Sequence, residues 1–185
     1  MAEHFHRYTA PDPERLAQDI ERARRDLSEA RANRSALAII EHAGDLAGML
    51  TTHRQESEAR DLLAPLQSTV REHLSSEPAG WYYLAFGTAS QYLGFRDEAN
   101  AMFAEALRLA REHSWEVLEH FALSHWGRSL VEEGQFPRAR ECFLQALAIR
   151  ERLNEPRAAS SRRHLAALSE LEAGMKLESQ SGAGM

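Results

Sequence analysis

The sequence has few of the features that mark secreted, membrane or disulfide-bonded proteins. Its single cysteine, Cys142, cannot form a disulfide within the chain and lies on the apolar side of an expected helix. No run of about eighteen apolar residues is present, and the N-terminus lacks a basic start followed by an apolar stretch. We therefore expect no membrane partner and a cytoplasmic location.

Lysine is almost absent, because Lys176 is the only one and the other basic residues are arginines. Lysine and arginine together number 22 against 28 acidic residues, which gives a formal net charge of −6. Binding to a nucleic-acid backbone normally requires a basic face, so nucleic acid is not an expected partner. The abundance of arginine and alanine resembles the composition of proteins from high-GC bacteria.

Catalytic motifs are also missing from the sequence. We find no glycine-rich phosphate loop, no nucleophile elbow, no paired cysteines and no His-Glu-x-x-His motif. Glu116, His120 and His125 share a neighbourhood on an expected helix, but a chain with nine histidines produces such spacings by chance. We expect no enzyme activity, no cofactor and no metal.

What the sequence does contain is a repeated helical pattern within a chain of one-domain length, 185 residues, of which 43% are hydrophobic. Its best copy has large or small apolar residues on two helices joined by a turn glycine: Tyr83, Phe86, Gly87, Ser90, Gly94, Ala99, Phe103 and Ala106. A shift of forty residues reaches Leu123, Trp126, Gly127, Leu130, Gly134, Ala139, Phe143 and Ala146. A shift back by forty reaches a weaker copy: Ala43, Leu46, Ala47, Leu50, Arg54, Ala59, Leu63 and Leu66. The sequence therefore predicts three helix-pair repeats.

This pattern resembles the tetratricopeptide repeat, in which small residues lie where the two helices of a pair cross and large residues fill the space beside them. The forty-residue period is longer than the usual thirty-four, as in the repeats of kinesin light chains. The resemblance implies an all-α fold, an α-solenoid of about eight helices with a capping helix at each end. It also implies that the protein binds other proteins rather than catalysing a reaction.

Along the chain, residues 1–11 are expected to be disordered, and Asp12 with Pro13 has the pattern of a helix start. We expect one helical domain over 12–174 and a disordered tail over 175–185. Its parts are a capping helix at 12–33, repeats at about 40–79, 80–119 and 120–155, and a second capping helix at 157–173. Pro65 should kink the second helix of the first repeat.

The first helix of each repeat is expected to line a concave groove that binds a peptide or helix of a partner. Aromatic and charged residues in this groove are the candidate contacts, because such residues dominate protein interfaces. The candidates are Asp45, Trp81, Leu84, Thr88, Tyr92, Phe121, His125, Arg128 and Glu132. Alternatively, Trp81 and Phe121 pack under the chain's own ends, which would fill the groove.

The resulting hypothesis is a non-catalytic adaptor or scaffold. Two alternatives fit the same fold: a dedicated chaperone or immunity-like partner that masks one protein, and a regulator that senses a small molecule or peptide. The sequence leaves the identity of the partner and the oligomeric state open.

Overall fold

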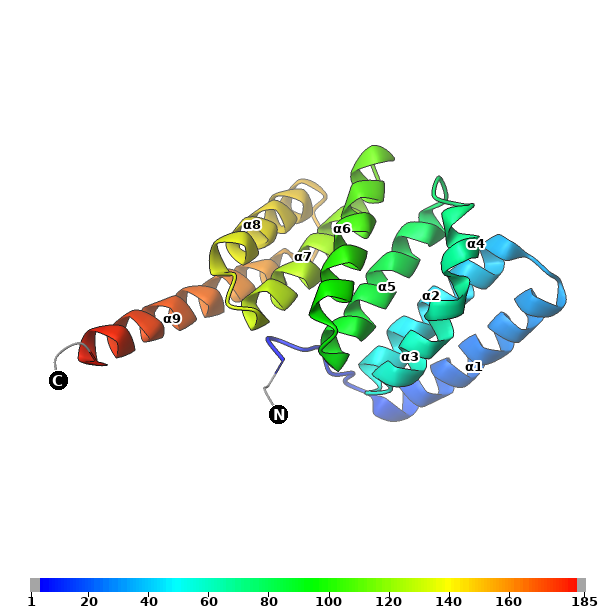
Figure 1. The fold of residues 1–185 in the computed structure, drawn as a ribbon, viewed down its shortest axis with the longest axis horizontal. Coiled ribbons are helices and arrows are strands. Elements are labelled where there is room, and N and C mark those ends of the chain that lie inside the picture. Colours follow the sequence, from blue (N-terminus) through cyan, green and yellow to red (C-terminus); the bar gives the residue numbers. More distant parts are fainter. Residues whose placement is uncertain (1–3, 183–185) are drawn as a thin grey trace.

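The computed structural model describes residues 4–182, and every regular element of this part of the chain is helical (Figure 1). Each helix packs on the next one along the chain, and the first helices of successive pairs also contact each other. This order produces the stacked helix pairs of an all-α solenoid. The elements are α1 (Pro13–Ala32), α2 (Ala36–Thr52), α3 (Glu56–Leu63), η1 (Ala64–Leu66), α4 (Gln67–Arg71), α5 (Glu77–Leu93), α6 (Arg96–Glu112), α7 (Glu116–Glu132), α8 (Phe136–Arg152) and α9 (Ala158–Gly182).

Close crossings hold the second and third pairs together. A side chain at Gly87 would place its Cβ 2.8 Å from the ring of Phe103, and one at Gly127 would lie 2.5 Å from the ring of Phe143. Both phenylalanines are fully buried, so neither ring can move aside for an added methyl group. The two glycines lie forty residues apart, and each leaves room for a phenylalanine ring at a close helix crossing, as the sequence pattern predicted.

Pro65 interrupts the second helix of the first pair, as predicted. It lies in η1, a short 3-10 turn between α3 and α4, where its ring cannot continue the α-helical hydrogen bonds. The first pair is therefore α2 with a broken partner, whereas the other pairs have a continuous second helix.

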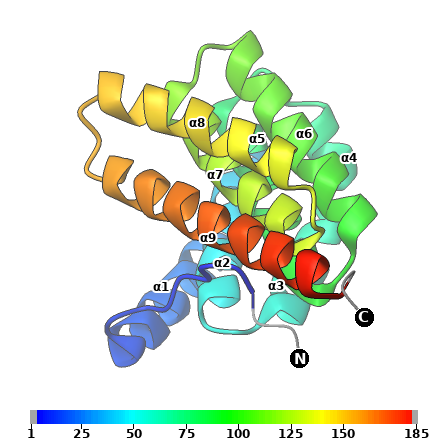
Figure 2. The same cartoon turned by 90° about the vertical axis from the view of Figure 1, so that its left-hand side faces the viewer.

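Both ends of the solenoid carry an additional helix. Helix α1 begins at Asp12, whose carboxylate accepts the backbone N–H of Arg15 (2.9 Å), and it packs on α2 through a stripe that includes Ile20 and Leu27. Helix α9 packs on α8 and buries Leu168 completely (Figure 2).

The two chain ends differ from the sequence expectation. Helix α9 continues to Gly182 instead of giving way to a disordered tail from 175, and Leu, Met, Lys and Glu in this stretch all favour a helix. Residues 4–10, expected to be disordered, lie against the helices; we call them the N-terminal segment. Residues 1–3 and 183–185, also expected to be disordered, lie outside the described residues.

Candidate functional site

The candidate site lies on the face formed by the first helices of the pairs, α2, α5 and α7, with α9 beside them; we call it the leading-helix face. The structure brings five of the nine candidate residues together near the C-terminal ends of α5 and α7: Thr88, Tyr92, His125, Arg128 and Glu132. Trp81 and Phe121 form a separate pair toward the other end of these helices. Asp45 is exposed on α2, and Leu84 belongs to the buried core with 5% of its surface exposed.

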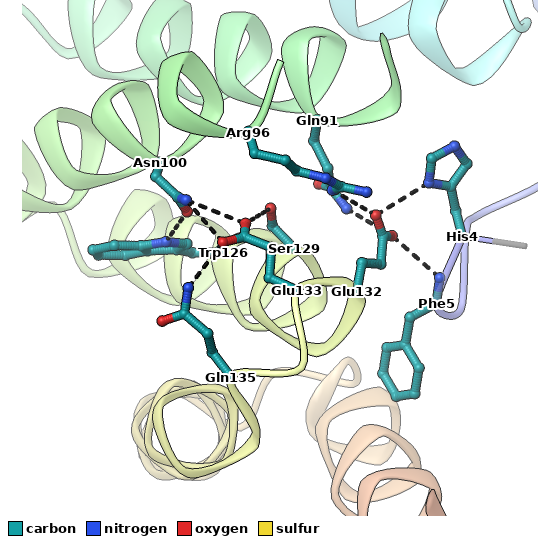
Figure 3. Close-up of polar contacts among 10 residues, drawn as sticks. All are labelled: His4, Phe5, Gln91, Arg96, Asn100, Trp126, Ser129, Glu132, Glu133 and Gln135. Carbon is teal, nitrogen blue, oxygen red and sulfur yellow. Dashed lines mark hydrogen bonds and ion pairs between the residues drawn. The ribbon is translucent and has the colours of Figure 1, made fainter. Parts of the chain in front are cut away.

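Glu132, at the last turn of α7, is the polar centre of the site (Figure 3). Its side chain is only 7% exposed and accepts hydrogen bonds from Gln91 Nε2 (2.9 Å) and Arg96 of the preceding pair, the latter at 2.7 Å. It also accepts the backbone N–H of Phe5 and the ring Nδ1 of His4, both at 3.2 Å. A carboxylate buried to this extent needs such partners, and two of them come from the N-terminal segment.

The N-terminal segment crosses the leading-helix face from α2 toward α9. Figures 1 and 2 show it in blue, leaving the start of α1 and running past the ends of the other helices. Arg7 holds one end: it donates to the carbonyl of Thr51 (2.9 Å), forms an ion pair with Glu56 and lies 3.9 Å from the centre of the Tyr92 ring. These are cation–π, ionic and main-chain contacts made by one side chain on three different helices.

Phe5 and His6 hold the other end of the segment. The ring of Phe5 lies 6.2 Å from Phe143 and 6.0 Å from His164, and the ring of His6 lies 5.3 Å from His164. The carbonyl of His6 accepts a hydrogen bond of 3.3 Å from Arg128. Glu132 and Arg128 thus bind the backbone of the segment, and aromatic rings contact its side chains.

Beneath the segment, Arg128 is 6% exposed and also donates to Nδ1 of His125 (2.9 Å). Burial and the neighbouring guanidinium hold the pKa of His125 well below its usual range, so this histidine is neutral and accepts the hydrogen bond. Burial, with Arg128 nearby, lowers the pKa of His164 to about 3. His125 and His164, which lie near Arg128, are therefore neutral.

A second buried arginine repeats this arrangement between α7, α8 and α9. Arg150, 3% exposed, donates to Nδ1 of His120 (3.2 Å), to Oγ of Ser161 (2.7 Å) and to the carbonyl of Arg157 (3.4 Å). Burial and this guanidinium lower the pKa of His120 to about 4. His120 was considered as a metal ligand, but in the structure it is a core residue bonded to an arginine.

Trp81 and Phe121 form the other part of the site. Their rings meet edge to face with centres 5.4 Å apart, and both are partly exposed. The guanidinium of Arg157 lies 5.1 Å from the centre of the Phe121 ring. Among the described residues, no hydrogen bond or aromatic pairing joins the N-terminal segment to these two rings, which pack against the core on their other side.

Within residues 4–182 no group of three His, Cys, Asp or Glu side chains is placed to hold a metal ion. Cys142 is buried, and burial raises its pKa to about 11, so its thiol is a weak nucleophile. None of the helices in this part of the chain is long and apolar enough to cross a membrane.

Sequence reasoning missed the residues that lie opposite the candidates. Phe5, Arg7, Arg96 and His164 complete the site, although the sequence analysis names none of them. The N-terminal segment has no helical period, so a search for periodic patterns assigns it no structure. Its run His4 to Tyr8, rich in aromatic and basic side chains, was the one signal that it packs against something.

The fold and the site define a helical-repeat solenoid in which the glycines at the helix crossings and turns occupy matching positions in the second and third pairs. Residues 122–157, which cover most of α7 and all of α8, match a family model described as a tetratricopeptide repeat. This part of the chain is similar to the tetratricopeptide repeat family. A search of curated proteins found no match.

Proposed function

We propose that this protein is a non-catalytic interaction module that binds a segment of a partner protein along its leading-helix face. Tetratricopeptide repeats generally mediate protein–protein interaction, which supports the class. The specific observation behind the proposal is that side chains on α5 and α7 already hold a stretch of polypeptide that forms neither a helix nor a strand and turns at Phe5 and His6. Glu132 and Arg128 bond to its main chain, and main-chain bonds do not depend on the sequence of the bound peptide.

The Trp81–Phe121 pair supports the same function. Aromatic side chains in partly exposed positions are frequent hot spots of protein interfaces, and this pair continues the face beyond the N-terminal segment. A partner that covers both parts would contact α5 and α7 along much of their length.

The test is affinity capture with wild-type protein and two matched variants, compared by quantitative mass spectrometry. Trp81→Ala with Phe121→Ala removes the aromatic pair, and Leu144→Ala removes an exposed apolar side chain from α8 instead. We expect the double variant to bind its partner at least about thirtyfold more weakly, which corresponds to ~2 kcal/mol of binding free energy. Leu144→Ala should bind the partner as wild type does. Equal capture by all three proteins, at unchanged circular dichroism, would remove the Trp81–Phe121 pair from the binding site.

The partner recovered in this way also separates an adaptor from a masking chaperone. A masked partner is unstable or aggregates when it is made alone, whereas the partner of an adaptor is stable by itself. A partner whose solubility depends on co-expression would favour the chaperone.

A further inference from the structure

The N-terminal segment occupies the leading-helix face as a ligand would. Its backbone bonds to Glu132 and Arg128, and Arg7 donates to a helix carbonyl, that of Thr51. The segment has no helix or strand of its own, so its position depends on these contacts. Figure 3 shows His4 and Phe5 beside the carboxylate of Glu132, to which Gln91 and Arg96 are also bonded.

Within residues 5–8, Phe5 and Arg7 are the two partly buried side chains, and the ring of His4 before them also contacts Glu132 and Tyr92. Phe5 packs among the rings of Phe143 and His164, and Arg7 lies on Tyr92 with its charge paired to Glu56. His6, between them, has an exposed side chain, and Tyr8 is 61% exposed. The face therefore selects an aromatic residue and an arginine two positions later.

The fit of the segment is incomplete. Four buried polar atoms in the segment or around it have no hydrogen-bond partner in the described residues: Arg7 Nε, Arg128 Nε, Gln91 Oε1 and His164 Nδ1. His6 adopts a left-handed backbone conformation with φ 46°, which is unfavourable for a residue other than glycine. Each unsatisfied buried group carries a desolvation cost, so another peptide that bonds to the free atoms of Arg128 and Gln91 would bind better than the segment does.

Resting on the function proposed above, we propose that the N-terminal segment is an intrachain occupant of the peptide site and that the partner presents an aromatic–X–Arg sequence. The partner must displace residues 4–7 to reach Glu132, Arg128 and Tyr92. Since the segment is tethered beside the site, its effective concentration is high and it lowers the affinity for every competitor. Only a partner with the same pattern and a better fit gains access.

The test uses the full chain with its own segment weakened. Phe5→Ala with Arg7→Glu removes the aromatic contact and places a carboxylate beside Glu56, which expels the segment. The probe is a fluorescent synthetic peptide of residues 2–10, measured by anisotropy. We expect this vacated variant to bind the peptide at least about tenfold more tightly than wild type does, because wild type is already occupied.

Two controls make the result specific. Tyr8→Ala, which changes an exposed side chain of the segment, should bind the peptide as weakly as wild type. A peptide in which alanine replaces its phenylalanine and arginine should not bind the vacated variant. If the vacated variant is unfolded by circular dichroism, Arg7→Ala alone serves in its place, with the same order of affinities expected. Equal binding of the natural peptide by wild type and by the folded variant, or no binding by either, would overturn the proposal.

A peptide display library panned on the vacated variant separates this inference from the proposed function. Enrichment of peptides with aromatic–X–Arg supports both. Enrichment of Trp81-dependent peptides with another pattern would leave the proposed function standing and refute the inference. If no peptide is enriched, the peptide-binding function itself fails, whatever the chain's own segment does.

Discussion

The two ends of the leading-helix face use the same helices in different ways. Near the C-terminal ends of α5 and α7, buried charges at Glu132 and Arg128 bond to the main chain of residues 5 and 6. Toward the N-terminal ends, Trp81 and Phe121 present aromatic rings with no described residue of the N-terminal segment on them. We call these the covered end and the open end.

The difference shows how a repeat fold can carry both structural and free binding surface on equivalent positions. Buried charges are stable only while their partners are present, so the covered end favours an occupant at all times. Partly exposed aromatic rings are stable without a bound segment, so the open end needs no occupant in the absence of a partner. The covered end should therefore affect stability, and the open end should affect binding.

The largest expected effect is that of Phe143→Ala at the covered end. The ring is fully buried, fills the space left by Gly127 and supports both Phe5 and His164. Its loss should lower the free energy of unfolding by ~3–5 kcal/mol, measured by urea denaturation. A loss below about 1 kcal/mol would mean that the covered end is not a packed part of the core.

Glu132→Ala should have the next largest effect. The change leaves Arg96 and Gln91 without their acceptor and releases the backbone of Phe5. We expect a loss of ~2–4 kcal/mol in unfolding free energy, since charge-assisted bonds to a buried carboxylate are the stronger kind. Glu112→Ala, which removes an exposed carboxylate on α6, is the matched control and should change little. Similar losses for the two variants would contradict a special role for Glu132.

Acid should destabilise the protein through its buried histidines. His120 and His164 have folded-state pKa values lowered to about 4 and about 3, so the unfolded chain binds more protons than the folded one below its own histidine pKa. Stability is then fully present above about pH 6.5 and falls as the pH drops toward the folded pKa values. Between pH 7 and pH 5 each of these two histidines should lower the free energy of unfolding by ~2 kcal/mol, which is measured as a falling midpoint of urea denaturation.

Histidine variants check the origin of this pH dependence. His164→Gln, at the covered end, should make the free energy of unfolding depend less steeply on pH. His53→Gln, at the exposed end of α2, should leave this dependence unchanged. An unchanged slope in His120→Gln and in His164→Gln would show that other groups cause the acid sensitivity.

The smallest effect on stability is expected at the open end. Phe121→Ala removes a partly exposed ring that contacts Trp81 and two arginine side chains. A loss of about 1 kcal/mol or less is expected in the same urea measurement, because much of the ring already faces solvent. A loss as large as that of Phe143→Ala would show that the open end is core and not a binding surface.

The sequence predicted the repeated parts of this molecule well. The glycines at 87 and 127 with the phenylalanines at 103 and 143 repeat at a fixed interval, and such a pattern places each residue within its helix pair. Pro65 predicted the break in its helix for a local reason, the missing N–H and the ring of proline. These features depend on nearby residues, which the sequence displays directly.

The N-terminal segment could not be predicted in the same way. Its contacts join Phe5 to Glu132 and Arg7 to Thr51, which are far apart in sequence and follow no period. Candidate residues such as Tyr92 and Glu132 were found because they fall on the exposed face of a periodic helix. Their occupant was missed because a segment without helix or strand leaves no repeating pattern in the sequence.

The central claim is that Arg7 is seated on the helices, and a double-mutant cycle between Arg7 and Glu56 tests it most directly. The side chain of Arg7 is 14% exposed and that of Glu56 is 15% exposed, so their ion pair is partly shielded from water. Unfolding free energies of wild type, Arg7→Ala, Glu56→Ala and the double variant give their coupling. The account predicts a coupling of at least about 1 kcal/mol, above the usual value for an exposed pair. A coupling near zero would mean that the N-terminal segment does not occupy the leading-helix face.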